Sequence, residues 1–141
     1  MPNLNYPPSL DTDVLKRSFV ASNGEVGVLP NDADSFLNAC EHDDIALAGW
    51  ELWVVGYACT PTGLVEASGR WAGLIPLCNS EVPAVFHGET QSEHGNDWKT
   101  YVCSSIVEIK QQLSLLRLSE EVDAKYLSSI RINFTLEQFV T

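Results

Sequence analysis

The sequence predicts one α+β domain in which an antiparallel β-sheet packs against helices. Two long apolar runs, 45–59 and 64–77, are separated by a short turn and have the composition of paired strands. Apolar residues recur every three or four positions over 97–116, which indicates a helix with one buried face. They alternate with polar residues over 130–136, as in a half-buried strand. Because 141 residues suffice for one core and no repeat is visible, we expect a single domain over 1–141.

The N-terminal segment is expected to form an extended lead-in and one helix. Residues 1–8 contain three prolines, which favour extended backbone. A helix is predicted over 9–22, because Ser9 can cap its start and Asn23-Gly24 can end it. Acids lie near its start and bases further along, as the helix dipole favours.

A second helix is expected after a short extended piece over 25–29. Asp32 or Asp34 can cap this helix, which runs to about Glu41. Two further acids follow at 43–44, where negative charge opposes the helix dipole. We therefore expect either an earlier helix end or an acidic corner kept for another purpose. Its predicted inward face comprises Ala33, Phe36, Leu37 and Cys40.

The two apolar runs should pair as a β-hairpin. Residues 60–63, Thr-Pro-Thr-Gly, fit a turn with Pro second and Gly fourth. Trp50 and Trp53 are three apart on the first strand, so they should point to opposite faces. A shorter strand over 82–87 and a polar loop over 88–96 follow. Glycines allow bends within the hairpin at Gly56, Gly69 and Gly73.

The C-terminal third should contain the clearest helix and a last strand. Asn96 or Asp97 can cap the helix over 97–116. A short helix from Ser119 to about Leu127 precedes the strand, which should be apolar on one face only. The predicted buried face of the long helix comprises Trp98, Val102, Ile106, Ile109, Leu113 and Leu116.

The charge of the chain is unevenly placed. The formal net charge is −11, and between residues 18 and 98 Arg70 is the only base against twelve acids. Such a field repels nucleic acid and anionic membranes and speeds association with basic proteins. We therefore expect no nucleic-acid or membrane partner and a basic protein partner. The alternative is that the acidity serves solubility alone.

The ends and the cysteines indicate a cytoplasmic protein. The start has no basic segment followed by an apolar run, and no stretch approaches the ~20 residues of a membrane span. Cys40, Cys59, Cys78 and Cys103 lie far apart among apolar neighbours, which is typical of buried reduced thiols. Two disulfides remain an open alternative that would indicate export.

The sequence contains no recognisable catalytic or metal motif. His42, His87 and His94 do not have the spacing of a helical metal pair, and phosphate-binding glycine patterns are absent. We therefore expect no enzyme, no metal and no cofactor. The alternative is a small enzyme that uses the 88–97 loop, where His87 and His94 could gather with Glu89 or Glu93.

Two motifs resemble the small immunity proteins of bacterial polymorphic toxin and contact-dependent growth inhibition systems. The first is Ile-Ala-Leu-Ala-Gly-Trp-Glu-Leu-Trp at 45–53, with Trp71 downstream, and the second is Asp-Trp-Lys-Thr-Tyr-Val-Cys-Ser-Ser at 97–105. The resemblance covers roughly 33–113. This sequence departs from the family pattern in two places: the glycine is single, Gly49, with Trp50 between it and Glu51, and Cys103 replaces the polar residue expected before the serines. It implies a cytoplasmic protein that binds and blocks one cognate toxin domain. Since nuclease toxins hold phosphate backbones, the charge favours a basic, nuclease-like toxin.

We expect the partner surface to be made of acids that accept hydrogen bonds from Lys and Arg of the toxin, with Trp53 as an aromatic anchor. An adaptor module that forms a homodimer through the aromatic hairpin is the first alternative, and the small enzyme is the second. The predicted acidic contact residues are Asp32, Asp34, Glu41, Asp43, Asp44, Glu89 and Glu93.

Overall fold

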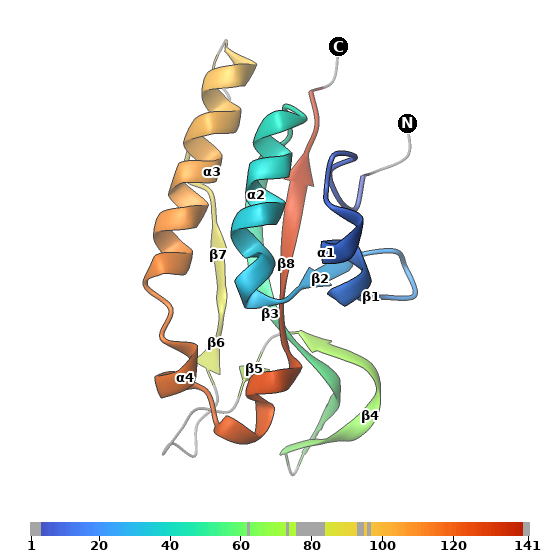
Figure 1. Cartoon of the computed structure of the whole chain (residues 1–141). Helices are drawn as coiled ribbons and strands as arrows, with labels where there is room; N and C mark the ends of the chain where they lie inside the picture. Colours follow the sequence, from blue (N-terminus) through green and yellow to red (C-terminus); the bar gives the residue numbers. More distant parts are fainter. Residues whose placement is uncertain are drawn as a thin grey trace.

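The chain folds as a curled antiparallel sheet with helices over one face, so the predicted α+β class is confirmed (Figure 1). The computed structural model describes residues 4–61, 63–72, 74–75, 84–92, 95 and 97–139. The helices are α1 (Thr12–Arg17), α2 (Ala33–His42), α3 (Trp98–Ser114) and α4 (Leu118–Glu121), with 3₁₀ turns η1 (Pro30–Asp32) and η2 (Ala124–Ser129). The strands are β1 (Phe19–Val20), β2 (Val26–Val28), β3 (Ala46–Thr60), β4 (Gly63–Ala72), β5 (Leu74–Ile75), β6 (Ala84–Val85), β7 (His87–Glu89) and β8 (Ile130–Glu137).

Strand β3 organises the sheet, whose order is β1-β2-β8-β3-β4. One side of β3 pairs with β8, and the other side pairs first with β7 and then with β4. The predicted hairpin is confirmed: Thr60 pairs with Gly63, and the register shifts beside Gly56. The prediction of one strand over 64–77 is wrong, because β4 ends at Ala72 and β5 begins a second, two-stranded sheet with β6. The remaining predictions for 73 and 76–83 lie outside the described residues.

The first helix is much shorter than the predicted 9–22. Asp11, not Ser9, caps it by accepting a hydrogen bond from the backbone N–H of Asp13. The helix ends at Arg17 because Phe19 and Val20 pair with β2 as a strand. Pairing with a distant strand therefore overrides the local helical pattern.

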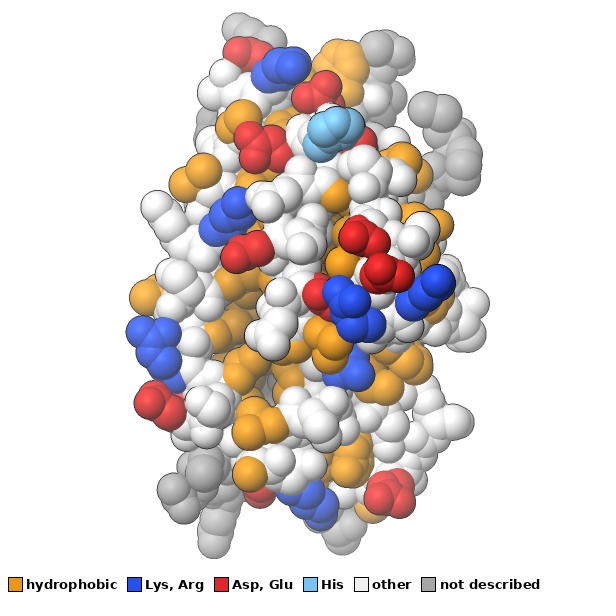
Figure 2. Space-filling model, viewed as in Figure 1, with side chains coloured by type: hydrophobic (Ala, Val, Ile, Leu, Met, Phe, Trp, Pro, Cys, Tyr) orange, Lys and Arg blue, Asp and Glu red, His pale blue; other side chains and the backbone are white. Residues whose placement is uncertain are grey.

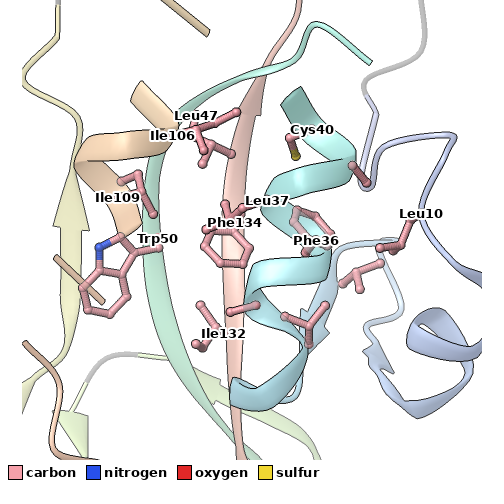
Figure 3. Packing of buried hydrophobic residues seen from close by; sticks show 14 of the residues in the cluster. Leu10, Phe36, Leu37, Cys40, Leu47, Trp50, Ile106, Ile109, Ile132 and Phe134 are labelled. Atoms are coloured by element: carbon pink, nitrogen blue, oxygen red, sulfur yellow. The ribbon is translucent and has the colours of Figure 1, made fainter. Parts of the chain in front are cut away.

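Helices α2 and α3 lie side by side over the sheet and enclose the main core (Figures 1 and 3). The predicted inward face of α2 is confirmed, since its four residues are buried. Of the six residues predicted for the long helix, Val102, Ile106 and Ile109 are buried, and the other three are partly buried against the same core. Phe36 stacks on Phe134 of β8 at 5.0 Å between ring centroids. Asp97 caps α3 by accepting from the backbone N–H of Lys99. Asn96, the other predicted cap, lies outside the described residues.

One buried polar group connects α3 to the sheet. The Ser105 hydroxyl accepts a hydrogen bond from the backbone N–H of Leu47 at 3.1 Å and donates to Val102 O. Leu47 precedes an irregularity in β3, where the β8 register shifts between Leu47 and Gly49. Ser105 therefore satisfies an N–H group where the ladder is interrupted.

The segment before β8 also differs from the prediction. Instead of one helix over 119–127, α4 and η2 are separated by the buried, extended residue Val122. In β8 the second face is not solvated throughout, because Asn133 is buried and its amide donates to Val26 O at 2.9 Å. Asn133 pairs with Gly27 of β2 and Glu51 of β3, on the face of the sheet that also carries the buried Trp53.

Trp50 and Trp53 lie on opposite faces of the sheet, as predicted. Trp50 packs in the main core beneath α3 (Figure 3). Trp53 lies outside that core, where it contacts the Phe19 ring edge-on at 6.2 Å and the Arg70 guanidinium at 4.2 Å. It is nevertheless fully buried. The sheet therefore curls enough for β1 and β4 to cover a second, smaller cluster.

No helix in the described part of the chain is long and apolar enough to cross a membrane.

Candidate functional site

Acidic side chains gather where α2 ends and α3 begins, at the end of the molecule that also holds the end of β8 (Figures 1 and 2). We call this surface the acidic end and define it as Glu41, Asp43, Asp44, Asp97 and Glu137. Glu41, Asp44 and Asp97 are exposed, whereas Asp43 and Glu137 are partly buried. It therefore unites three of the predicted contact residues with two that lie far away in sequence.

The turn after α2 explains how two acids come to follow a helix. Asp43 caps the helix, and Asp44 adopts a left-handed backbone with φ of 56°. Asp and Asn tolerate this conformation better than other non-glycine residues do. The backbone N–H of Ile45 then donates to Cys40 O, which directs the chain into β3. Because the carboxylates lie beside the negative end of the helix dipole, they increase the negative potential of this surface.

Asp43 is fixed by hydrogen bonds. Its carboxylate accepts from the backbone N–H of Ser9 at 2.8 Å and contacts Nδ1 of His42 at 3.1 Å. Desolvation by itself raises the pKa of Asp43, but the hydrogen bonds from Ser9 and His42 outweigh it and hold that pKa below its ordinary value. Asp43 therefore anchors the N-terminal segment. It adds negative charge to the acidic end, but its carboxylate is already engaged by Ser9 and His42.

An aromatic group adjoins these acids. The Trp98 ring lies 5.5 Å from the rings of both Tyr101 and Phe139. Phe139 is 52% exposed, which is unusual for so large an apolar side chain. The Trp98 indole donates to Asp44 O at 2.8 Å, and the buried Tyr101 hydroxyl donates to Glu137 at 3.0 Å. Burial first and then the Glu137 carboxylate raise the pKa of Tyr101 to about 12, so its hydroxyl stays a donor.

The site combines negative charge with an aromatic surface on two packed helices. Lys99 approaches Asp44 at 3.8 Å and is the one Lys or Arg that the described contacts place against these acids. Interfaces that recognise basic proteins use this combination, since carboxylates pair with Lys and Arg while aromatic rings supply apolar contact.

The predictions that Asp32 and Trp53 contact a partner are wrong, because both side chains are used inside the fold. Asp32 is buried and forms a two-pronged ion pair with Arg17, at 2.9 and 3.2 Å, which ties α1 to the start of α2. Trp53 has no exposed surface and cannot serve as an aromatic anchor. Trp53 is covered because the sheet curls, and the alternation of residues along a strand does not predict that curl.

The other predicted residues do not join the acidic end. Asp34 is exposed in the first turn of α2, at the opposite end of that helix. Glu89 is exposed on β7, and Glu93 lies outside the described residues. Sequence reasoning did not place Asp97, Glu137 or Phe139 at this surface. The amphipathic faces of the two helices were the only sequence signal that the helices pack together, and those faces do not fix which ends meet.

The cysteine prediction is half correct. Cys40 is a fully buried free thiol, and desolvation followed by the Asp43 charge raises its pKa to about 12. Cys103 is a free thiol too, but it is exposed on the outer side of α3, 4.0 Å from Glu41. The error arose because one residue of an amphipathic helix faces outward among apolar neighbours. The side chains of Cys59 and Cys78 lie outside the described residues.

The predicted 88–97 loop site is only partly described. His87 and Glu89 lie on β7, and His94 lies outside the described residues. Within the described part of the chain, no three His, Cys, Asp or Glu side chains are placed to hold one metal ion.

The fold and the site together define a single α+β unit with an acidic, aromatic end. Comparison with protein-family models, with curated proteins and with solved structures finds no match.

Proposed function

We propose that this protein is a cytoplasmic inhibitor that binds one basic protein toxin, of the nuclease-like kind, and blocks it, as small immunity proteins do. The observation that carries the proposal is the acidic end. There, three exposed carboxylates, Glu41, Asp44 and Asp97, adjoin an aromatic group that includes the half-exposed Phe139.

The charge of this surface supports capture of a basic partner. Carboxylates steer a positively charged protein during its approach and then accept hydrogen bonds from its Lys and Arg side chains. A nuclease-like toxin must carry such residues, because it holds the phosphate backbone of its substrate. The acidic end would therefore compete with that substrate for the same basic groups.

The aromatic group supports the stability of such a complex. Aromatic side chains are enriched among the residues that contribute most to protein interfaces. The Trp98 indole is held by its bond to Asp44 O, so little conformational entropy would be lost when a partner packs on it. Phe139 offers apolar surface that the fold does not cover.

The first experiment is capture of the partner with the tagged protein from its native host at low salt, followed by mass spectrometry. We expect one basic protein in a 1:1 ratio, and inhibition of its activity after purification of both components. Binding should weaken strongly at about 0.5 M salt, where surface charges are screened.

Charge reversal then tests the surface. The double variant Glu41→Lys, Asp44→Lys should bind the purified partner at least about tenfold more weakly, since two attractive contacts become repulsive. The double variant Glu66→Lys, Glu120→Lys makes the same charge change and is the matched control, because Glu66 on β4 and Glu120 on α4 are exposed and remote from the acidic end (Figure 1). Equal loss in both variants would show a bulk charge effect and contradict the site. Recovery of the protein alone, with a mass that rises with concentration, would replace the proposal with the self-association alternative.

A further inference from the structure

A second surface lies at the opposite end of α2 and α3 from the acidic end. It is a hollow of about 520 Å³ where α2 begins and where α3 is followed by α4 (Figure 1). Figure 2 shows apolar side chains at the surface in this region, in the lower half of the view. We call it the helix-end hollow, and it shares no residue with the acidic end. Its apolar lining residues are Pro30, Ala33, Leu113, Leu116, Leu118 and Ile132.

The hollow exists because α3 ends before its run of apolar residues does. The helix ends at Ser114, and the backbone N–H of Leu116 then donates to Leu113 O as the chain turns. Leu113 and Leu116 pack against the main core but are only partly buried, and the buried Ile132 of β8 lines the hollow from the sheet. Leu115, which lies between two lining residues, is 75% exposed. The fold therefore leaves apolar surface uncovered around the hollow, and apolar patches of this kind mark binding sites.

Arg117 lines the hollow with one edge of its guanidinium group free. Its Nη1 group donates to Ser114 O at 2.8 Å and to Leu116 O at 3.2 Å, so the group is fixed over the last carbonyls of α3. Its Nε and Nη2 groups form the other edge and have no hydrogen-bond partner in the described part of the chain. Such an edge can hold a carboxylate through two parallel hydrogen bonds.

The charge of the hollow differs from that of the whole chain. Lys110 and Arg117 line it against one acid, Asp34, whereas the chain has 8 bases and 19 acids. Lys110 Nζ donates to the neutral side chain of Asn38 at 3.1 Å, and neither base forms an ion pair with any residue that the structure describes. The hollow therefore combines two cations that the fold does not neutralise with apolar surface that it does not cover.

This combination selects the class of ligand. Small-molecule pockets usually have roughly 300–1,000 Å³ and an apolar lining with a few polar groups, as the hollow has. An inorganic anion would not contact the leucines, and a neutral apolar molecule would gain nothing from the two cations. We propose that the helix-end hollow binds an aliphatic carboxylate. Its carboxylate pairs with Arg117 and is attracted by Lys110, and its hydrocarbon chain packs on the apolar lining.

The probe is decanoate, titrated into the full chain by calorimetry at low ionic strength and below its micelle concentration. We expect saturation at one decanoate per chain. Decan-1-ol and decylammonium have the same hydrocarbon chain but lack the negative charge, so they should bind at least about tenfold more weakly. Equal binding of the three compounds would show a nonspecific apolar surface and overturn the proposal.

Variants of the lining test whether decanoate binds in this hollow. Arg117→Gln should weaken binding about tenfold, because it removes a charge-assisted pair of hydrogen bonds, and Lys110→Gln about threefold, because its charge acts without such a pair. Arg117→Lys keeps the charge but loses the second parallel hydrogen bond, so its affinity should lie between those of Arg117→Gln and the wild type. Lys99→Gln removes one charge from the other end of α3 and is the matched control for Lys110→Gln.

One substitution should act in the opposite direction. Asp34→Asn removes the single acid of the lining and should strengthen decanoate binding about threefold. Asp34 is exposed, and a gain of affinity cannot result from unfolding, so this variant keeps the test valid if the Arg117 variants are unstable. Weaker binding by Asp34→Asn would contradict the proposal.

The proposal also fails if decanoate gives no saturable signal, or if Lys99→Gln weakens binding as much as Arg117→Gln does. It does not depend on the proposed inhibitor function. Glu41→Lys, Asp44→Lys should weaken capture of the basic partner and leave decanoate binding intact, whereas Arg117→Gln should do the reverse, so the two proposals can fail separately.

Discussion

The two faces of the sheet bury their tryptophans by different means. On the helix face, Trp50 joins a continuous apolar core beneath α2 and α3. On the opposite face, Trp53 is buried beneath Phe19 and the cationic side chain of Arg70, and its indole bonds to Glu51. On the helix face Trp50 packs among apolar side chains and its indole donates to Gln112, whereas on the opposite face Trp53 packs against both a ring and a cation. The difference shows how one strand, β3, can support an apolar core on one face and a cluster that includes a charged side chain on the other.

The largest expected effect tests whether the cluster around Trp53 stabilises the fold as the main core does. Phe36→Ala on the helix face and Trp53→Ala on the opposite face should each lower the free energy of unfolding by about 3–5 kcal/mol, because both leave large cavities. Urea denaturation of the two variants provides the comparison. A loss below about 1 kcal/mol for Trp53→Ala would mean that the second cluster collapses or rehydrates without cost.

The next prediction concerns Gly88, where β7 packs closely against Trp50 and Gln112. A Cβ atom at Gly88 would clash with Gln112 Oε1 and Trp50 Nε1, so Gly88→Ala should destabilise the protein by about 1–3 kcal/mol. Thermal unfolding checks the value. If the clash with Gln112 is the main cause, the double variant Gly88→Ala, Gln112→Ala should lose less than the sum of the single variants.

A single polar group on the apolar face should matter less than either change. Ser105→Ala removes the acceptor for the Leu47 N–H, which is left unpaired in the core, and should cost about 1–2 kcal/mol. Ser104→Ala on the same helix is the control, since the Ser104 hydroxyl only donates to Tyr101 O within α3. Equal losses for the two serines would contradict a special role for Ser105.

The smallest effect belongs to the acidic end and depends on pH. Because the folded pKa of Asp43 is depressed, its stabilising contribution is present above the unfolded pKa and is lost as the pH falls through the folded value. Stability measured from about pH 5 downward should therefore decline less steeply in Asp43→Asn than in the wild type. Parallel pH profiles for the two proteins would show that the Ser9 and His42 hydrogen bonds do not favour the charged form.

Local sequence patterns were enough to predict the elements that depend on one segment of the chain. The 97–116 periodicity predicted α3 and three of its buried residues, because residues three and four apart share one side of a helix. The turn residues at 60–63 predicted the hairpin, and the spacing of Trp50 and Trp53 placed them on opposite faces. These inferences needed only the geometry of one helix or one strand.

Features that depend on which distant segments meet could not be predicted from local patterns. Phe19 and Val20 became a strand because β2 was there to pair with them, and Trp53 was buried because β1 and β4 curl over it. Asp97 and Glu137 joined Asp44 at one end, while Asp32 was neutralised by Arg17. The net charge alone could not separate these acids, because a carboxylate's role is set by its neighbours in space and its neighbours in sequence do not specify them.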